Sequence, residues 1–357
     1  MYDYLLVQGG AERLTLTLAE RFPTADLCVA SRNRAAVPDT LLEGLNIIDL
    51  QANAKTVPWR IIKSLHVFSR NTCFLRDYDW VLYGGNYSVS AVHNHKAGRN
   101  IHYCHTIPRF CYDLREYYLD RYPFWQRPLL QTLMAHVKSH YVKAINKMDL
   151  IIANSENVQA RIRRYLNKDS VVIHPPCDTD RFKWIGQQDY YLSTARLEPF
   201  KRVDSIIAAF KQMPDKHLVI ASGGSELLRL QQLAVNADNI HFTGWIDEDQ
   251  LYRLVGNAIA TIYVPIDEDF GMSPVESMAA GKPVIGVAEG GLLESVINQE
   301  TGLLFSDQSI IDALKLAVQT MTTRRALTMR TACEKRARLF SKDIFFNAIG
   351  QVLLNSP

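Results

Sequence analysis

The sequence predicts an α/β protein with two doubly wound domains, and three observations indicate this. The chain has 357 residues, of which 47% are hydrophobic and 22% charged, as in a globular protein of two domains. Short β-branched runs alternate with helical patterns, which is typical of parallel sheets covered on both faces. The turn His174-Pro175-Pro176 follows a helical segment and stiffens the chain. We therefore expect a first domain at 1–168 and a second at 169–341.

Strands and helices are expected in alternation. The strand segments are rich in β-branched and aromatic residues between turn signals, and they are Ala25–Val29, Trp80–Tyr83, Asn100–Tyr103, Leu150–Ala153, Val171–His174, Tyr190–Thr194, His217–Ala221, Ile240–Thr243, Ala258–Tyr263 and Pro283–Val287. Helices are expected at 11–21, 156–166 and 203–212. A last helix at 342–357, capped by Ser341, is expected to pack back onto the first domain.

The composition indicates the cellular compartment of the protein and the kind of partner it binds. Six cysteines are scattered without a Cys-x-x-Cys pair, which argues against zinc and disulfides and fits a reducing cytosol. We find no signal-peptide pattern and no apolar run of about 20 residues, so a cytoplasmic protein is expected, free or peripheral at the inner face of the membrane. Residues 1–175 hold 22 Lys and Arg against 15 Asp and Glu (+7), and the remainder holds 18 against 22 (−4). The asymmetry indicates an anionic partner for the first half, or only an excess of solvated basic residues.

The segment from Glu268 to Glu276 is the clearest candidate site. A loop follows the strand that ends near Pro265, and a helix is expected to start at Ser273-Pro274. The free N–H groups of a helix N-terminus suit a diphosphate, and the two carboxylates could bind sugar hydroxyls. In the alternative, Glu276 only stabilises the first turn of the helix and Glu268 is a solvated loop charge.

Two further turns in the second domain follow strands. Arg196 and Lys201 could neutralise a pyrophosphate. The basic residues directly before the helix at 203–212, Lys201-Arg202, are unfavourable beside its N-terminus unless an anion is bound there. The pair Gly223-Gly224 after Ser222 is weaker evidence, since two glycines often form only a turn.

The first domain offers two candidates. Gly9 and Gly10 open the helix at 11–21 and allow a ligand to approach its end closely. His105 lies at the carboxyl end of the strand at 100–103, where substrates meet sheets of this kind. A lone histidine can equally be structural.

Two segments look like metal-binding Asp-x-Asp motifs, but neither is expected to bind a metal. Asp77-Tyr78-Asp79 precedes a strand, and Asp267-Glu268-Asp269 belongs to the Glu268–Glu276 segment. No metal cofactor and no nucleic-acid partner is expected.

In their order along the chain, these segments resemble the retaining glycosyltransferases of family 4, which have the GT-B fold of two Rossmann-like domains facing a cleft. The similarity extends from Gly9 to about Asn347 and is greatest to the mannosyltransferase branch that builds bacterial O-antigen and other surface polysaccharides. It rests on Gly9-Gly10-Ala11-Glu12, His105-Thr106-Ile107-Pro108-Arg109, Ala153-Asn154-Ser155, Asp178-Thr179-Asp180-Arg181-Phe182, Arg196 with Lys201, Gly244-Trp245, and Glu268-x7-Glu276 with Phe270-Gly271 inside it.

The resemblance implies a role for each segment. The first domain would bind the acceptor and the second the nucleotide sugar. The catalytic candidates are His105, Arg196, Lys201 and Glu268. Donor contacts would come from Gly10, Gly224, Gly244, Trp245, Phe270, Gly271, Met272, Ser273 and Glu276, with Glu276 on the ribose and Gly244-Trp245 framing the base. Acceptor contacts would come from Arg109 and Asp113.

The implied reaction is retaining transfer of a hexose to a glycan or lipid-linked acceptor, with the diphosphate stabilised without a metal. GDP-mannose is the first expectation for the donor, and a UDP-sugar is the second. A sugar-nucleotide epimerase of the same fold and a non-catalytic glycosyltransferase-like subunit are the alternatives.

Two features depart from the family pattern. The strand before Gly9 is expected to be nearly absent, because the chain reads Met1-Tyr2-Asp3-Tyr4 there. Either the start is truncated or the first sheet lacks its innermost strand. Ser222 replaces a usual glycine.

Residues 109–147 suggest a membrane surface as a partner. They hold seven Lys and Arg against three acids, interleaved with Phe110, Tyr112, Tyr117, Tyr118, Tyr122, Phe124, Trp125 and Tyr141. Basic residues beside Trp and Tyr suit the headgroup layer of an anionic bilayer. In the alternative, most of these aromatic residues are core.

Overall fold

The computed structural model describes residues 1–7, 9–96, 98–306 and 309–355, and the chain divides into two compact units, 1–173 and 174–357. The division falls at His174, beside the proline pair, whereas the sequence predicts a boundary at 168. Residues 356–357 of the expected last helix lie outside the described residues. The packing of that helix onto the first domain stays a prediction.

The first unit contains two groups of parallel strands, in the orders β1-β2-β3 and β4-β5-β6-β7. Their bounds are β1 Tyr2–Leu5, β2 Asp26–Arg32, β3 Asn46–Asp49, β4 Trp80–Tyr83, β5 Arg99–Cys104, β6 Leu150–Ala153 and β7 Val171–Val172. Residues 27–31 of β2 and 100–104 of β5 are all buried, as expected for strands covered on both faces, although Ser31, Asn100 and His102 among them are polar.

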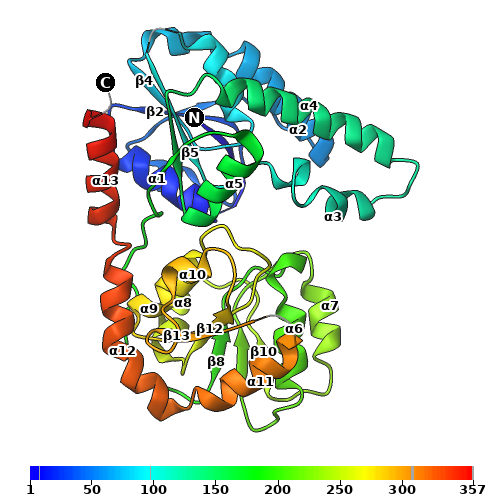
Figure 1. Cartoon of the computed structure of the whole chain (residues 1–357), viewed down its shortest axis with the longest axis vertical. Helices are drawn as coiled ribbons and strands as arrows, with labels where there is room; N and C mark the ends of the chain where they lie inside the picture. The colour runs from blue at the N-terminus through cyan, green and yellow to red at the C-terminus, as the bar shows by residue number, and fades with distance from the viewer. Residues whose placement is uncertain (8, 97, 307–308, 356–357) are drawn as a thin grey trace. The chain divides into compact units, whose positions relative to one another are not determined.

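Two hydrogen bonds join these groups of strands. The amine of Met1 donates to the C=O of Leu82 at 2.8 Å, and the N–H of Gly84 donates to the C=O of Met1 at 2.9 Å. This is the pattern of a parallel ladder in which Met1 lies opposite Tyr83, and the N-terminus lies beside β2 and β4 (Figure 1). The expectation that the innermost strand is missing is therefore wrong: β1 is present, but short.

Helices and 3₁₀ turns connect the strands of the first unit. They are α1 Gly10–Arg21, η1 Asp39–Leu42, α2 Val57–Arg70, η2 Cys73–Asp77, η3 Ser88–Asn94, η4 Arg109–Cys111, α3 Arg115–Asp120, α4 Arg127–Ile145 and α5 Glu156–Leu166. Helices α2 and α4 both pack against η3. Helix α5 begins where the Ser155 hydroxyl accepts the N–H of Val158 at 3.0 Å, and ends at Asn167 in a left-handed conformation.

A buried carboxylate fixes β1 to the start of η3. Asp3 accepts hydrogen bonds from the N–H groups of Asn86 (2.7 Å), Tyr87 (2.9 Å) and Ser88 (2.7 Å). Burial raises the pKa of Asp3 to about 6, although these hydrogen bonds act in the opposite direction. The residue therefore has a structural role that its sequence context does not reveal.

The second unit is a doubly wound parallel sheet with the order β10-β9-β8-β11-β12-β13. Its strands are β8 Tyr191–Ser193, β9 Leu218–Ile220, β10 Ile240–Phe242, β11 Thr261–Tyr263, β12 Val284–Val287 and β13 Gly302–Phe305. Its helical segments are η5 Pro199–Lys201, α6 Val203–Phe210, α7 Leu227–Leu233, α8 Glu248–Asn257, α9 Met272–Ala279, α10 Leu292–Ser295, α11 Ile310–Thr320, α12 Thr323–Arg338 and α13 Lys342–Asn355. Helices α6, α7 and α11 lie on one side of the sheet and α8 and α9 on the other (Figure 1).

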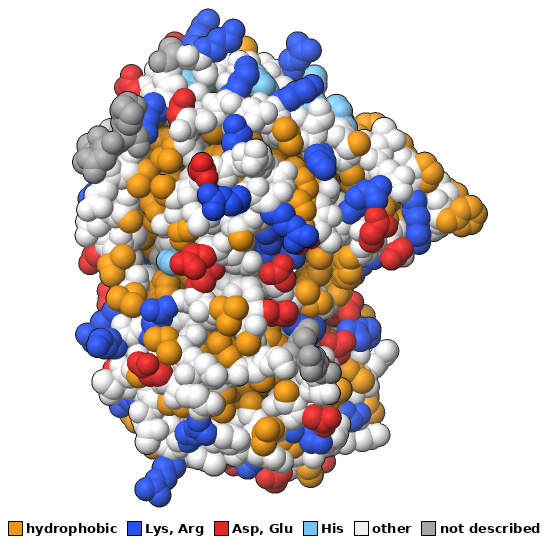
Figure 2. All heavy atoms as spheres, in the orientation of Figure 1, with side chains coloured by type: hydrophobic (Ala, Val, Ile, Leu, Met, Phe, Trp, Pro, Cys, Tyr) orange, Lys and Arg blue, Asp and Glu red, His pale blue; other side chains and the backbone are white. Residues whose placement is uncertain are grey.

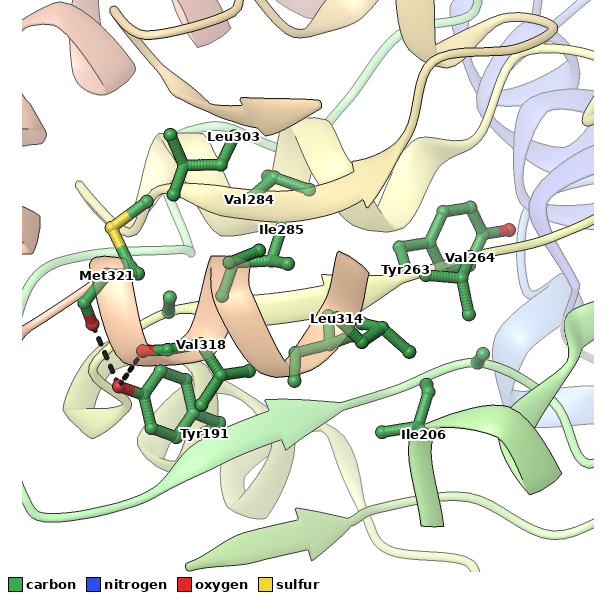
Figure 3. Packing of buried hydrophobic residues seen from close by; sticks show 14 of the residues in the cluster. Tyr191, Ile206, Tyr263, Val264, Val284, Ile285, Leu303, Leu314, Val318 and Met321 are labelled. Carbon is green, nitrogen blue, oxygen red and sulfur yellow. Dashed lines mark hydrogen bonds between the residues drawn. The ribbon is translucent and has the colours of Figure 1, made fainter. Parts of the chain in front are cut away.

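The core of the second unit lies between this sheet and its helices (Figure 3). Tyr191 is buried at the start of β8, and its hydroxyl donates to the C=O groups of Val318 (3.1 Å) and Met321 (2.8 Å). The end of α11 is thereby held against the sheet, and the one polar atom of this buried ring is satisfied.

The fold class is confirmed. Each expected strand is present, with ends shifted by a few residues, and the segments at β1, β3 and β13 add strands that the patterns did not indicate.

Candidate functional site

The turns at one edge of the second sheet gather most of the candidate residues. All strands of this sheet are parallel, so their carboxyl ends share one edge, where ligands of doubly wound sheets bind. The residues that follow β8, β9, β10, β11 and β12 there are Arg196, Gly223-Gly224, Gly244-Trp245, Glu268 and Gly290-Gly291 respectively.

Lys201 and Glu268 form the central polar contact of this edge. The Lys201 ammonium donates to a carboxylate oxygen of Glu268 at 2.5 Å and to the Tyr263 hydroxyl at 3.0 Å. Burial alone would lower the pKa of Lys201, but the Glu268 carboxylate and Tyr263 outweigh it and raise that pKa. Lys201 is therefore a fixed positive charge at neutral pH. Tyr263 was not among the expected site residues, although it ends a predicted strand.

Arg202 has a structural role at the start of α6. It is the N-cap residue with a left-handed φ of 49°, and its guanidinium donates to the C=O groups of Val264 (2.8 Å) and Pro265 (2.7 Å) and contacts Glu289. The two basic residues beside this helix N-terminus thus have carboxylate partners within the protein. Lys201 and Arg202 therefore do not need a bound anion to balance their charges.

The start of α9 differs from the expectation. Gly271 is the N-cap, with φ of 83°, and the helix begins at Met272, so Ser273 is not the cap. Glu276 lies in the second turn and is only 8% exposed, so its proposed role as a first-turn acid is wrong. The N–H groups of the first turn have no partner within the helix, and they lie on the loop that carries Glu268.

A glycine pair supports that loop from the next strand. A side chain at Gly290, where φ is 58°, would meet the backbone of Glu268 at 2.5 Å, and one at Gly291 would meet the Cα of Phe270 at 2.3 Å. The N–H of Gly291 also donates to the C=O of Glu268 at 2.8 Å. This pair was not among the predicted site residues, although it follows a predicted strand as Gly223-Gly224 does.

The turns after β9 and β10 meet each other. A side chain at Gly223 would lie 2.4 Å from the indole nitrogen of Trp245, and one at Gly224 would meet the backbone of Leu197 at 2.4 Å. Gly244 has a φ of 70°, which allows the chain to turn there. Trp245 itself is 71% exposed, so one side of its ring is accessible to a ligand.

Arg196 is exposed at the end of β8. Its side chain makes no hydrogen bond or ion pair with the part of the chain that the structure describes. Since Lys201 is already paired with Glu268, Arg196 is the basic candidate with its full hydrogen-bonding capacity available to an anion.

The first unit places His105 directly after β5. Its ring contacts those of Tyr103 and Tyr2, and its buried Nε2 has no hydrogen-bond partner among the described residues. Burial, with His102 nearby, lowers the pKa of His105 to about 3, so the imidazole is neutral near pH 7. It can form a hydrogen bond to a ligand but is a poor general base there.

The remaining first-unit candidates lie in or beside helical segments. Gly10 is the first residue of α1, and a side chain at the preceding Gly9 would meet the Glu12 carboxylate at 2.6 Å. The Nε (2.8 Å) and Nη2 (2.6 Å) of Arg109 both contact Oδ2 of Asp113 in an ion pair. A ligand would therefore meet them as a pair.

Metal ligands are not clustered in the described structure. No group of three or more His, Cys, Asp or Glu in residues 1–7, 9–96, 98–306 and 309–355 could hold a metal ion. Asp79 precedes β4, and Asp267 has a left-handed φ of 43° in the loop after β11.

The segment joining α3 and α4 exposes large apolar side chains. The exposed fractions are 81% for Phe124, 66% for Trp125 and 75% for Leu129, and Figure 2 shows hydrophobic surface at the outer end of this segment with Lys and Arg beside it. Other aromatic residues of the same stretch, such as Tyr141, are core. No helix in the described part of the chain is long and apolar enough to span a bilayer.

Both halves of the chain match family models of glycosyltransferases. Residues 8–181 match the model "Glycosyltransferase Family 4", and residues 178–340 match "Glycosyl transferases group 1". The D-inositol 3-phosphate glycosyltransferase of Mycobacterium sp. (strain JLS) is 26% identical over 56% of this chain and 50% of its own. The O-antigen chain mannosyltransferase RfbU of Salmonella typhimurium is 27% identical over 51% of this chain and 53% of its own.

The similarity to these relatives therefore spans about half of their length. In structure, the chain is similar over 99% of both chains to HepE of Anabaena in complex with UDP, with a TM-score of 0.73 and 16% sequence identity. This similarity concerns the fold.

Proposed function

Because the chain belongs to the family 4 glycosyltransferases, we propose that it transfers a hexose from a nucleotide-diphosphate sugar to a glycan or lipid-linked acceptor with retention of configuration. The observation that carries the proposal is the edge of the second sheet, where a fixed Lys201–Glu268 pair, the exposed Arg196 and the N-terminus of α9 follow the neighbouring strands β8 and β11. Such an edge offers fixed positive charge and free N–H groups to a diphosphate.

The proposed chemistry needs only groups of this chain. Arg196 and the first-turn N–H groups of α9 stabilise the negative charge that develops on the leaving diphosphate. Lys201 orients the Glu268 carboxylate, which binds sugar hydroxyls. Glu276 binds the ribose and the open side of Trp245 packs near the base. His105, neutral near pH 7, forms a hydrogen bond to the transferred sugar.

The donor is proposed to be GDP-mannose. The O-antigen mannosyltransferase among the relatives supports mannose, whereas the bound UDP of the structural neighbour supports a UDP-sugar as the second candidate. The exposed apolar and basic residues between α3 and α4 support a lipid-linked acceptor at a membrane surface, since Trp and Phe beside Arg suit the interface.

A donor panel tests the function. The protein is incubated with GDP-mannose, UDP-glucose, UDP-galactose and UDP-N-acetylglucosamine, each with and without a lipid-diphosphate-linked acceptor. Release of nucleoside diphosphate that requires the acceptor supports a transferase. An isomerised nucleotide sugar without any acceptor would instead identify an epimerase, and binding without turnover of any donor would identify a non-catalytic subunit.

A further inference from the structure

His174, the first residue of the second unit, packs against the segment that carries Glu268. Its ring centroid lies 5.2 Å from that of Phe270 and 5.4 Å from that of Phe340, and the two phenylalanine rings are 5.4 Å apart. Both phenylalanine side chains are buried. Phe270 therefore belongs to a cluster of three rings, and it directly precedes Gly271, the N-cap of α9.

A carboxylate fixes the orientation of the His174 ring. Nε2 of His174 and a carboxylate oxygen of Glu294 are 3.0 Å apart, and the Glu294 side chain is only 10% exposed. Helix α10, which carries Glu294, is itself held by Arg336, whose guanidinium donates to the C=O of Ser295 at 3.0 Å and to that of Glu294. Because a hydrogen bond to a carboxylate sets the orientation of an imidazole, the ring is held in one position against Phe270.

The backbone at His174 is fixed as well. The N–H of Ile173 donates to the C=O of Ala153 at 3.0 Å, and the C=O of Ile173 accepts the hydroxyl of Tyr103 at 2.8 Å. The two prolines that follow His174 restrict the chain on the other side. The imidazole therefore contacts Phe270 from a backbone with little freedom to shift.

Helix α10 reaches the same segment at a second point. The N–H of Gly291 donates to the C=O of Glu268 at 2.8 Å, and the N–H of Glu294 donates to the C=O of Gly291 at 3.2 Å. One end of α10 thus holds the backbone at Glu268, and Glu294 acts through His174 on Phe270. Loss of the His174 ring would release only the second of these two contacts.

We propose that His174 is a positioning residue of the donor site: paired with Glu294, its ring holds Phe270 and thereby places the first-turn N–H groups of α9. The inference rests on the proposed function, in which those N–H groups bind the diphosphate. His174 acts through Phe270 and not on the substrate. A shift of Phe270 moves the adjoining turn, and hydrogen bonds to an anion weaken steeply once their geometry is lost.

Three substitutions separate the contributions of His174. His174→Ala removes the ring and the hydrogen bond, His174→Phe keeps only the ring contacts, and His174→Gln keeps only a donor toward Glu294. Calorimetry with GDP and with UDP measures the affinity for a nucleoside diphosphate. We expect the Kd to rise about tenfold for His174→Ala, the size expected for one weakened hydrogen bond to a charged group, and to rise less for the other two variants. His217→Ala is the control and should not change the Kd, because this exposed histidine precedes β9 at the opposite edge of the sheet.

Hydrogen exchange locates the effect without any nucleotide. In His174→Ala, exchange should be at least about threefold faster in peptides that cover 268–280, and unchanged in peptides that cover β9 and β10, because local opening is confined to the segment that loses its support. A parent protein that binds neither GDP nor UDP would contradict the proposed function, and the exchange measurement would still decide the role of His174.

Two results would overturn the proposal. One is exchange over 268–280 that is equal in His174→Ala and the parent. The other is faster exchange throughout the second unit together with a lower melting temperature, which would make His174 an ordinary core residue. Glu294→Gln keeps an oxygen acceptor for the imidazole and serves if His174→Ala does not fold. Its exchange over 268–280 should lie above that of the parent, and parent-like exchange in this variant would equally refute the role.

Discussion

The ammonium of Lys201 lies 2.5 Å from the carboxylate of Glu268, and the same ammonium donates to Tyr263. Lys201 and Glu268, which were predicted as separate contacts to a donor, therefore form one ion pair. Replacing either member leaves the other as a poorly compensated charge in a mostly buried place, where the side chains are only 14% and 17% exposed.

The first prediction follows from this pair. Lys201→Met and Glu268→Gln should each lower turnover by about 10²–10³, and the double variant should cost clearly less than the product of the two, because the residues act together. Steady-state kinetics with the identified donor measures the three variants. Tyr263→Phe is the mild control, since it removes one hydrogen bond and keeps the ion pair. Strictly multiplicative losses would refute the coupling.

Arg196→Ala should lower turnover by about 10²–10³ with little change in melting temperature, because this arginine is exposed and would contact the developing diphosphate charge. Arg181→Ala is the matched control: Arg181 is also an exposed arginine of the second unit, but its ion pair is with Glu248. Activity within a few-fold of the parent for Arg196→Ala would remove it from the diphosphate site.

Metal independence is the third prediction. Activity should persist in excess EDTA, because the diphosphate is expected to be stabilised by Arg196 and by helix N–H groups. The assay is nucleoside diphosphate release before and after chelation. Complete loss that manganese or magnesium restores would contradict it and would return attention to Asp267 and Asp269.

Membrane binding is predicted for the segment between α3 and α4. The protein should co-sediment with liposomes that contain anionic lipid, less so at physiological salt than at low salt. Replacing Phe124, Trp125 and Leu129 by Ser should abolish this, and neutralising Arg121, Arg127, Lys138 and Lys143 together should weaken it. Leu316→Ser is the control, because this leucine of the second unit is also 66% exposed. Recovery in the supernatant under all conditions would argue for a soluble acceptor.

The buried Asp3 predicts a pH dependence of stability. Its pKa is raised to about 6 from an unfolded value of 3.8, so the folded protein binds the proton more tightly. The stabilisation of the folded state by the protonated Asp3 carboxyl is fully present below about pH 4. It is lost as pH rises through 6, so that the free energy of unfolding falls by up to about 3 kcal/mol. Asp3→Asn lacks this titration. Urea unfolding at pH 4 and pH 7 should show the parent losing stability relative to Asp3→Asn, and a constant difference would refute the shift.

Much of the second domain's site was predictable, because strand, turn and helix signals occur together there. Glu268, Gly224 and Arg196 each follow a continuous apolar run, and parallel strands bring such turns to one edge. The partners of these residues were not predictable. Nothing local indicates that Lys201 pairs with Glu268, since 67 positions separate them.

Two elements differ from their predicted form for physical reasons. The helix at α9 begins one residue before Ser273 because Gly271 adopts the positive φ that ends the loop. Serine and proline are good start signals, but the backbone conformation of the glycine decided the start. In β1, the polar Asp3 interrupts the apolar run, and pairing with β2 and β4 supplies the order instead.

The glycine pair after β12 has a consequence for genetic surveys. Any side chain at Gly290 or Gly291 would displace the backbone of Glu268 or Phe270, so nearly all substitutions there should inactivate the protein. In a scan of all single variants, these two positions would rank with the reactive residues although neither offers a functional group. Intolerance there would report the shape of the neighbouring loop, and alleles with alanine at these positions are the natural source of temperature-sensitive strains.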